Sequence, residues 1–155
     1  MTTPNWQHIL TTTDLSPFAS KAVAYAHGLA EKFGAELHVL HVVDSADKAA
    51  AQHAVAGTYD PAEIAEPQTA WLGELLGETG TIRRVEAVQI GKDVAEKIVQ
   101  YAEKHDIDLI VLASHGRTGM AHFWLGSVAE KVIRSSHCPV LVLRPFPDEF
   151  ANRPS

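Results

Sequence analysis

The sequence lacks several features that define common protein classes. It has 155 residues and a single cysteine, Cys138, so no internal disulfide can form and a disulfide-stapled secreted scaffold is excluded. No apolar run approaches the roughly 18 residues of a membrane-spanning helix. The first ten residues lack the basic start and apolar stretch of a signal peptide. These absences predict a cytoplasmic protein with no membrane span.

Clustered positive charge and metal-ligand spacing are also missing. The chain carries 13 Lys and Arg against 19 Asp and Glu, a net charge of −6, and has no long basic run. We therefore expect no general nucleic-acid binding, which depends on cations that neutralise phosphates. Among the nine histidines, His115 and His122 share one segment, but no carboxylate or thiol stands beside them at a ligand spacing. We expect no metal ion held by the protein alone.

Short apolar runs alternate along the chain with longer segments of helical periodicity. The apolar runs predict five strands, at His8–Thr13, Leu37–Val43, Arg84–Ile90, Leu109–Ser114 and Val140–Arg144. The periodic segments predict four helices, at about residues 17–33, 67–76, 94–102 and 128–133. Ser16 is the expected N-cap of the first helix and Gly34 its stop. Asp106 and Asp108, before the fourth strand, are interpreted as solvated loop residues.

This alternation predicts one α/β domain over residues 1–155, with its core at 7–145 and an irregular tail at 146–155. We expect a single open, twisted, five-stranded parallel sheet in the Rossmann-like order 3-2-1-4-5, with helices on both faces. Ligands of such sheets bind outside the carboxyl ends of the strands, where the strand order reverses. The predicted ligand crevice therefore lies between the first and fourth strands.

The segment "LASHGRTGMAHFWLGSV", Leu112 to Val128, reaches that crevice. Gly116 follows the fourth strand, and Gly126 and Ser127 precede the fourth helix. The first amides of a helix have no internal partner, and the helix dipole favours an anion there. Gly126 has no Cβ to keep a phosphate away, and Ser127 can cap the helix or donate its hydroxyl. The pattern indicates a phosphate-binding loop; an ordinary turn between strand and helix is the alternative.

Motifs of several enzyme classes are absent from the chain. It has no G-x-x-x-x-G-K-[ST], no G-x-G-x-x-G and no G-x-S-x-G. These absences argue against a P-loop enzyme, a Rossmann dehydrogenase and an α/β-hydrolase. We expect no dedicated catalytic residues.

Two long segments carry a resemblance to a known family. "ILTTTDLSPFASKAVAYAHGLAEKFGAELHVLHVVD" and "DLIVLASHGRTGMAHFWLGSVAEKVIRSSHCPVLVLR" resemble the two halves of the universal stress protein family, across Ile9 to Arg144. The ATP-binding branch of that family is similar to G-x-x-G, nine residues, then G-[S/T]. Gly116, Gly126 and Ser127 match this pattern, whereas Ala113 stands at the first glycine. Membership of a second branch of the family, which does not bind ATP, is therefore the alternative.

The resemblance implies a site for ATP, or for ADP or AMP, with Mg²⁺ held by the phosphates. Asp14 would contact the ribose or adenine, Val42 would contact adenine, and Arg117 would reach a γ-phosphate or make a surface ion pair. The full set of implied nucleotide-binding residues is Thr12, Thr13, Asp14, Val42, Leu112, Ala113, His115, Gly116, Arg117, Gly126, Ser127, Val128 and Ala129.

Three functions follow from these patterns and from the resemblance. The first is an ATP-binding regulatory protein of the stress response that acts on an unknown protein partner. The second is a weak ATPase, for which His115 is the one nearby candidate base. The third is a partner-binding stress protein that does not use ATP. In each case the apolar strand Val140–Arg144 is expected at a sheet edge, and the resemblance implies a symmetric homodimer through it.

Overall fold

The computed structural model describes residues 4–45, 82–114 and 125–144. They form a parallel five-stranded sheet with the order β3-β2-β1-β4-β5, which confirms the predicted fold class and order. The strands are β1 (His8–Thr13), β2 (Glu36–Asp44), β3 (Arg84–Gly91), β4 (Leu109–Ala113) and β5 (Val140–Leu143). The helices are α1 (Pro17–Phe33), α4 (Val94–Lys104) and α5 (Ser127–Ser135). The predicted helix at 67–76 and the tail at 146–155 lie outside the described residues.

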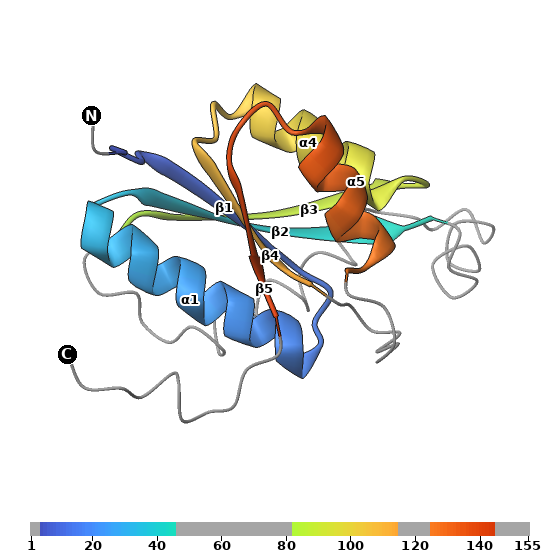
Figure 1. Cartoon of the computed structure of the whole chain (residues 1–155), viewed down its shortest axis with the longest axis horizontal. Coiled ribbons are helices and arrows are strands. Elements are labelled where there is room, and N and C mark those ends of the chain that lie inside the picture. Colours follow the sequence, from blue (N-terminus) through green and yellow to red (C-terminus); the bar gives the residue numbers. More distant parts are fainter. Residues whose placement is uncertain (1–3, 46–81, 115–124, 145–155) are drawn as a thin grey trace, which may run out of the picture.

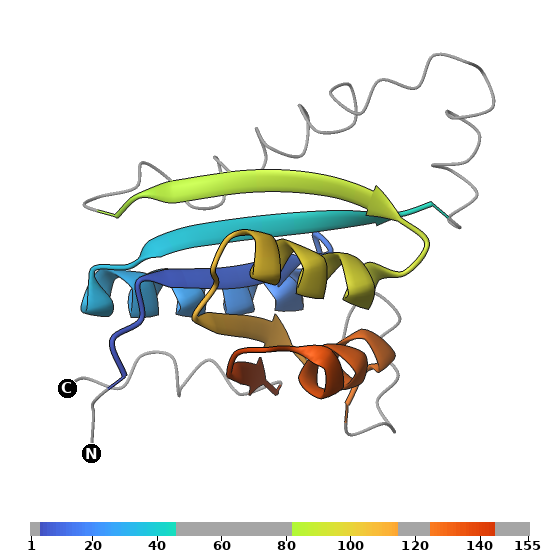
Figure 2. The ribbon, with the colours of Figure 1, turned by 90° about the horizontal axis from the view of Figure 1, so that it is seen from above.

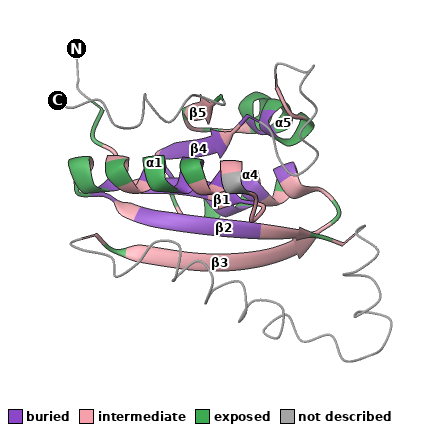
Figure 3. Cartoon of the chain, turned by 90° about the horizontal axis from the view of Figure 1, so that it is seen from below, coloured by how far each residue is buried: buried purple, intermediate pink, exposed green. Residues whose placement is uncertain are grey.

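Helices cover both faces of this sheet, with α1 on one side and α4 and α5 on the other (Figure 1 and Figure 2). Alternate strand residues therefore belong to different clusters. Ile9 and Val111 pack with Val23 of α1, whereas Leu10 and Ile110 pack in the cluster of α4 and α5. The central strands are buried and the edge strands β3 and β5 only half-buried (Figure 3). Burial on both faces explains why β4, with the sequence LIVLA, is apolar at every position.

Local capping explains where the helices begin and end. The side chain of Ser16 accepts the N–H of Ala19 at 3.2 Å, which confirms it as the N-cap of α1. Gly34 ends that helix with a positive φ of 65°, as expected for a C-terminal glycine. The N-cap of α4 is Asp93, which accepts the N–H of Glu96 at 3.1 Å. The sequence analysis did not identify this cap.

The amino ends of the strands are joined by Asp108. Its Oδ2 accepts the N–H groups of Gln7 at 2.8 Å and His8 at 2.9 Å. The backbone N–H of Asp108 donates to the His8 carbonyl at 2.9 Å. The side chain of Asp108 is partly solvated, as expected, but the sequence analysis missed its structural role, because contacts to residues a hundred positions away leave no signal in local sequence. Asp108 fixes the start of β1 against the start of β4.

A buried histidine lies at the same edge of the sheet. His38 Nδ1 is 2.9 Å from the Tyr101 hydroxyl, and its Nε2 is 3.0 Å from Oε1 of Glu36. The other carboxylate oxygen of Glu36 pairs with Arg83 Nε at 3.1 Å. The ring of His105 stacks on Tyr101 with centroids 4.1 Å apart. Burial lowers the pKa of His38, although Glu36 acts to raise it. This network holds the end of α4 against β2.

Candidate functional site

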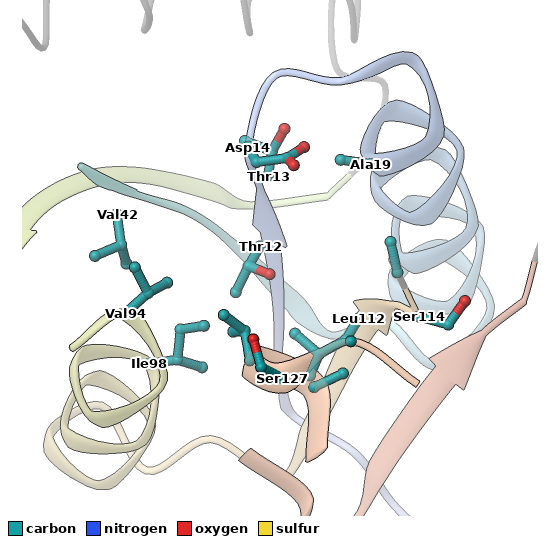
Figure 4. Close-up of a pocket in the computed structure, with 14 residues that line it drawn as sticks. Thr12, Thr13, Asp14, Ala19, Val42, Val94, Ile98, Leu112, Ser114 and Ser127 are labelled. Atoms are coloured by element: carbon teal, nitrogen blue, oxygen red, sulfur yellow. The ribbon is translucent and has the colours of Figure 1, made fainter. Parts of the chain in front are cut away.

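A cleft opens at the carboxyl ends of β1 and β4, where the strand order reverses (Figure 4). It encloses about 720 Å³ of space between its atoms, part of it open to solvent. The cleft is lined by Thr12, Thr13, Asp14, Ala19, Val42, Val94, Ile98, Leu112, Ala113, Ser114, Gly126, Ser127, Val128 and Ala129.

Most of the residues proposed from sequence meet in this cleft. The structure brings together Thr12, Thr13, Asp14, Val42, Leu112, Ala113, Gly126, Ser127, Val128 and Ala129. His115, Gly116 and Arg117 lie outside the described residues. The strands and the start of α5 thus reach one site across more than 110 positions of sequence.

The sequence analysis missed the contribution of α4. Val94 and Ile98 lie one helical turn apart and, with Val42, form an apolar wall on one side of the cleft (Figure 4). Their spacing had indicated only a helix face directed at the core. Ala19 and Ser114 also line the cleft without having been proposed as binding residues. One signal in the sequence could have indicated this contribution. Val94 is the first residue of the helix that follows β3, and that helix begins at the carboxyl edge of the sheet, where the crevice was predicted.

The turn from β1 to α1 is fixed by its own side chains. Thr13 Oγ1 accepts the N–H of Leu15 at 3.0 Å, and Oδ1 of Asp14 accepts the N–H of Ser16 at 3.0 Å. Leu15 has a positive φ of 66°, a strained value for a leucine. Within the described ranges, no donor is bonded to Oδ2 of Asp14. Asp14 therefore shapes the helix-start turn and also presents an acceptor to the cleft.

Backbone donors lie at the start of α5. Gly126 is the N-cap, with φ −70° and ψ 153°, and no side chain caps the helix. Ser127 is the first helical residue, so its interpretation as a cap was wrong. The N–H of Gly126 donates to the Ser114 carbonyl at 2.7 Å, which ties the end of β4 to the start of α5. The amides of Ser127, Val128 and Ala129 precede the first intrahelical donor and can bind an anion.

Ala113 stands where the sequence pattern of the ATP-binding branch has glycine. It is the last residue of β4 and pairs with Leu143 of β5. Among the described non-glycine residues, positive φ occurs at Leu15 and Asp106 and not at Ala113, so the backbone there does not require glycine. By strand alternation its Cβ points to the α1 side, as Val111 does. The effect of the alanine is therefore limited to one methyl group at the rim of the cleft.

The cleft has opposite chemistry at its two ends. Asp14 is the one ionisable side chain among the described residues that line it, and it supplies a negatively charged acceptor. The start of α5 supplies amide donors and the positive end of a helix dipole. In the described part of the chain, no cluster of three or more His, Cys, Asp or Glu could hold a metal ion. No described helix is long and apolar enough to cross a membrane. The arrangement suits a ligand with donor groups at one end and an anion at the other.

Comparison with known proteins gives consistent matches over most of the chain. The model of the Universal stress protein family matches residues 5–144. A universal stress protein of Methanocaldococcus jannaschii is 33% identical over 154 residues, covering 90% of this chain and 82% of the relative. Universal stress protein YxiE of Bacillus subtilis is 30% identical over 152 residues, covering 88% and 97%.

Solved structures with the same fold include nucleotide complexes. The universal stress protein UspA from Lactobacillus plantarum has a TM-score of 0.76 at 24% identity, covering 92% of this chain and 100% of its own. A universal stress protein in complex with cAMP has a TM-score of 0.66 at 22% identity, covering 91% and 98%. One from Archaeoglobus fulgidus in complex with dAMP has a TM-score of 0.62 at 20% identity, covering 90% and 98%. At these identities the similarity establishes the fold alone.

Proposed function

This chain belongs to the universal stress protein family, and we propose that it is a regulatory stress protein that binds an adenine nucleotide in the cleft. The observation that carries the proposal is the opposition of an acidic acceptor, Asp14, and the amides at the start of α5 across one cleft. A nucleoside phosphate has the complementary order, with hydroxyl and amine donors at one end and phosphates at the other. The cAMP and dAMP complexes of fold neighbours support the same ligand class.

The nucleoside would lie along β1 and the apolar wall. Oδ2 of Asp14 would accept a hydrogen bond from a ribose hydroxyl or the adenine amine. Val42, Val94 and Ile98 would cover the base, because together they offer an apolar surface next to the carboxyl end of β1. The remaining nucleoside contacts would come from Thr12, Thr13, Leu112 and Ala113.

The phosphates would lie at the start of α5. The amides of Ser127, Val128 and Ala129 and the Ser127 hydroxyl would donate to phosphate oxygens. Gly126 would act through its lack of a Cβ, since its own N–H is bonded to Ser114. His115, Gly116 and Arg117 would complete the phosphate contacts as part of this proposal. Mg²⁺ would be bound through the phosphates of ATP.

A second candidate function is partner binding without ATP, and the observation that favours it is Ala113. Its methyl group lies at the rim of the cleft, where the nucleotide-binding pattern has no side chain. We prefer nucleotide binding, because Ala113 has ordinary strand geometry and the rest of the cleft keeps its donors and acceptor.

We also propose that the chain forms a symmetric homodimer. We place it in the cytoplasm, because its single cysteine suits a compartment in which disulfides are rare. β5 is an edge strand, and the carbonyls of Pro139 and Leu143 both face β4. By alternation, the backbone of Val142 faces the outer edge. Val142→Pro removes an outward N–H without breaking the pairing with β4. Light scattering should give twice the chain mass for the wild type and a shift toward monomer for Val142→Pro; a wild-type monomer would refute the dimer.

The test of nucleotide binding uses the protein as purified. Mass spectrometry of small molecules released by denaturation should detect an adenine nucleotide, and calorimetry should give affinity for ATP, ADP or AMP with and without Mg²⁺. Asp14→Asn keeps the acceptor for the Ser16 N–H and removes the charge, whereas Asp14→Ala removes both. Both should weaken binding, the alanine variant more. No heat from any of the three nucleotides at millimolar concentration would overturn the proposal and favour ATP-independent partner binding.

A further inference from the structure

A buried histidine on β2 contacts the turn that carries Asp14. The side chain of His41 is directed to the face covered by α1, and the residue is only 7% exposed. Its Nδ1 lies 2.7 Å from the backbone carbonyl oxygen of Thr13. The two residues are also register partners, the last pair between β1 and β2. This hydrogen bond therefore forms at the point where β1 ends and the turn begins.

The chemistry of this contact determines the state of the imidazole ring. A carbonyl oxygen only accepts hydrogen bonds, so Nδ1 of His41 must carry the proton. Both the neutral Nδ1–H tautomer and the imidazolium ion satisfy this requirement. The bond is buried, and removing its donor would leave the Thr13 carbonyl without that partner.

The turn beyond Thr13 needs such support. The two side-chain hydrogen bonds within the turn span only two residues each, and Leu15 adopts a strained positive φ. His41 lies 28 positions away in the sequence. Its hydrogen bond therefore connects the turn to the neighbouring strand β2, whereas the other two bonds lie within the turn. Its chain neighbour Val42 lines the cleft. His41 therefore links the turn that carries Asp14 to β2, whose next residue forms part of the apolar wall.

We propose that His41 is a positioning residue of the nucleotide site, which orients Asp14 by holding the Thr13 carbonyl. The inference rests on the proposed function, because it assigns a role within that site. It differs from the reading of His41 as a satisfied core histidine, which predicts an effect on stability alone. His41 does not touch the nucleotide, and it acts through Thr13 and Asp14.

Three variants separate these readings when nucleotide affinity and thermal unfolding are measured together. His41→Leu removes the donor and should weaken ATP or ADP binding about tenfold, the cost of a lost buried hydrogen bond. His41→Asn places an amide N–H near the position of Nδ1 and should return affinity to within about threefold of wild type. Val39→Ala, on the same face of β2, should lower the unfolding temperature and leave affinity unchanged.

Each outcome of this experiment supports or overturns the inference. Wild-type affinity in His41→Leu overturns it, and so does an asparagine variant as weak as the leucine variant. An equal loss in Val39→Ala shows that general stability sets the affinity, and also overturns it. A wild-type protein that binds no adenine nucleotide refutes the proposed function itself, and this inference with it. That result can be distinguished from a failure of this inference alone, because it is obtained on the wild-type protein before any variant is measured.

A measurement on the wild type covers the case in which His41→Leu fails to fold. Nitrogen-15 spectra of the imidazole rings report which ring nitrogen of His41 carries the proton. We expect Nδ1–H in both the free and the nucleotide-bound protein, and slower amide hydrogen exchange at Leu15 and Ser16 when nucleotide is bound. A neutral His41 with its proton on Nε2, or exchange rates unchanged by nucleotide, would overturn the proposal.

Discussion

The two ends of the sheet use polar side chains in opposite ways. At the amino ends of the strands, Asp108, His38, Glu36 and Tyr101 bond to one another or to nearby backbone. At the carboxyl ends, Asp14 and the first residues of α5 line a cleft instead. The amino edge therefore has its polar groups partnered within the fold, whereas the carboxyl edge places an acidic residue and helix amides at a cleft.

This difference follows from parallel topology. Helices return from the carboxyl edge to the amino edge, so the turns at the carboxyl edge place helix N-termini beside strand ends. Partial positive charge accumulates there and requires an anion or a cap. The amino edge receives helix C-termini, such as that of α4 near Tyr101, which are closed by local contacts. Variants at the two ends should therefore separate binding from stability.

The largest effect is expected for Gly126→Asp at the carboxyl edge. The new carboxylate would cap α5 and occupy the amides that the phosphate would use. Loss of two charge-assisted hydrogen bonds should weaken nucleotide binding about 100-fold or more. The free energy of unfolding should rise by only a few tenths of a kcal/mol, roughly the gain of such a cap over glycine.

Calorimetry and thermal unfolding of Gly126→Asp and Gly126→Ala test this prediction. The alanine variant adds a methyl group without a cap, so it isolates the steric effect at the close approach. Strong nucleotide binding by the aspartate variant would show that the start of α5 is not the phosphate site.

The next effect is on stability at the amino edge. Asp108→Ala should lower the free energy of unfolding by about 1–2 kcal/mol, because two backbone donors lose a charged acceptor that is itself partly solvated. Asp108→Asn keeps an acceptor and should cost about half as much. Nucleotide affinity should stay within about twofold of wild type in both variants, since the hydrogen bonds lost lie at the opposite edge. Urea unfolding and calorimetry measure the two quantities, and a large change in affinity would contradict the separation of the two ends.

A smaller, pH-dependent effect is expected from His38. Burial lowers its folded-state pKa, with His105 and His8 acting in the same direction and Glu36 against it. The unfolded chain therefore binds more protons than the folded chain as pH falls below about 6.5, and stability declines. The slope of unfolding free energy against pH, between neutral and mildly acidic pH, should be shallower in His38→Gln than in wild type. Equal slopes would mean that His38 is not the group responsible.

The smallest effect compares two residues with positive φ, one at each edge. Leu15 has φ 66° at the carboxyl edge and Asp106 has φ 50° at the amino edge. Aspartate adopts this conformation at a lower energetic cost than leucine. Leu15→Gly should raise the free energy of unfolding by roughly 0.5–1 kcal/mol after the entropic cost of glycine. Asp106→Gly should give no gain, and equal effects in thermal unfolding would show that the carboxyl edge stores no strain.

Much of the fold was predictable from the sequence. The bounds of β1 were predicted at His8–Thr13 and observed there, and β4 and β5 end one residue before their predicted ends. Ser16 and Gly34 marked the ends of α1 because capping depends on residues within one turn. These features are local, so a window of a few residues contains their cause.

The contacts that define the site were not local. The apolar spacing of Val94 and Ile98 predicted a helix but not that its first turn would line the cleft. The bond from His41 to Thr13 depends on the register of β1 and β2, which no local pattern reports. Serine is a common N-cap, so Ser127 was expected to precede the helix. In the structure α5 begins at Ser127 itself, and Gly126 is the N-cap.

The sequence by itself determined the order of elements, the family resemblance and the residue types at the predicted crevice. It could do so because hydrophobic periodicity, caps and motif spacing depend on residues that are close together in the sequence. Only the tertiary structure decided which polar groups are already partnered and which face the cleft. Gly126 shows the distinction: its place beside the proposed phosphate site follows from the motif, but the hydrogen bond from its N–H to the Ser114 carbonyl follows from how β4 meets α5. Hydrogen-bond partnership depends on distance in space, which the order of residues does not fix.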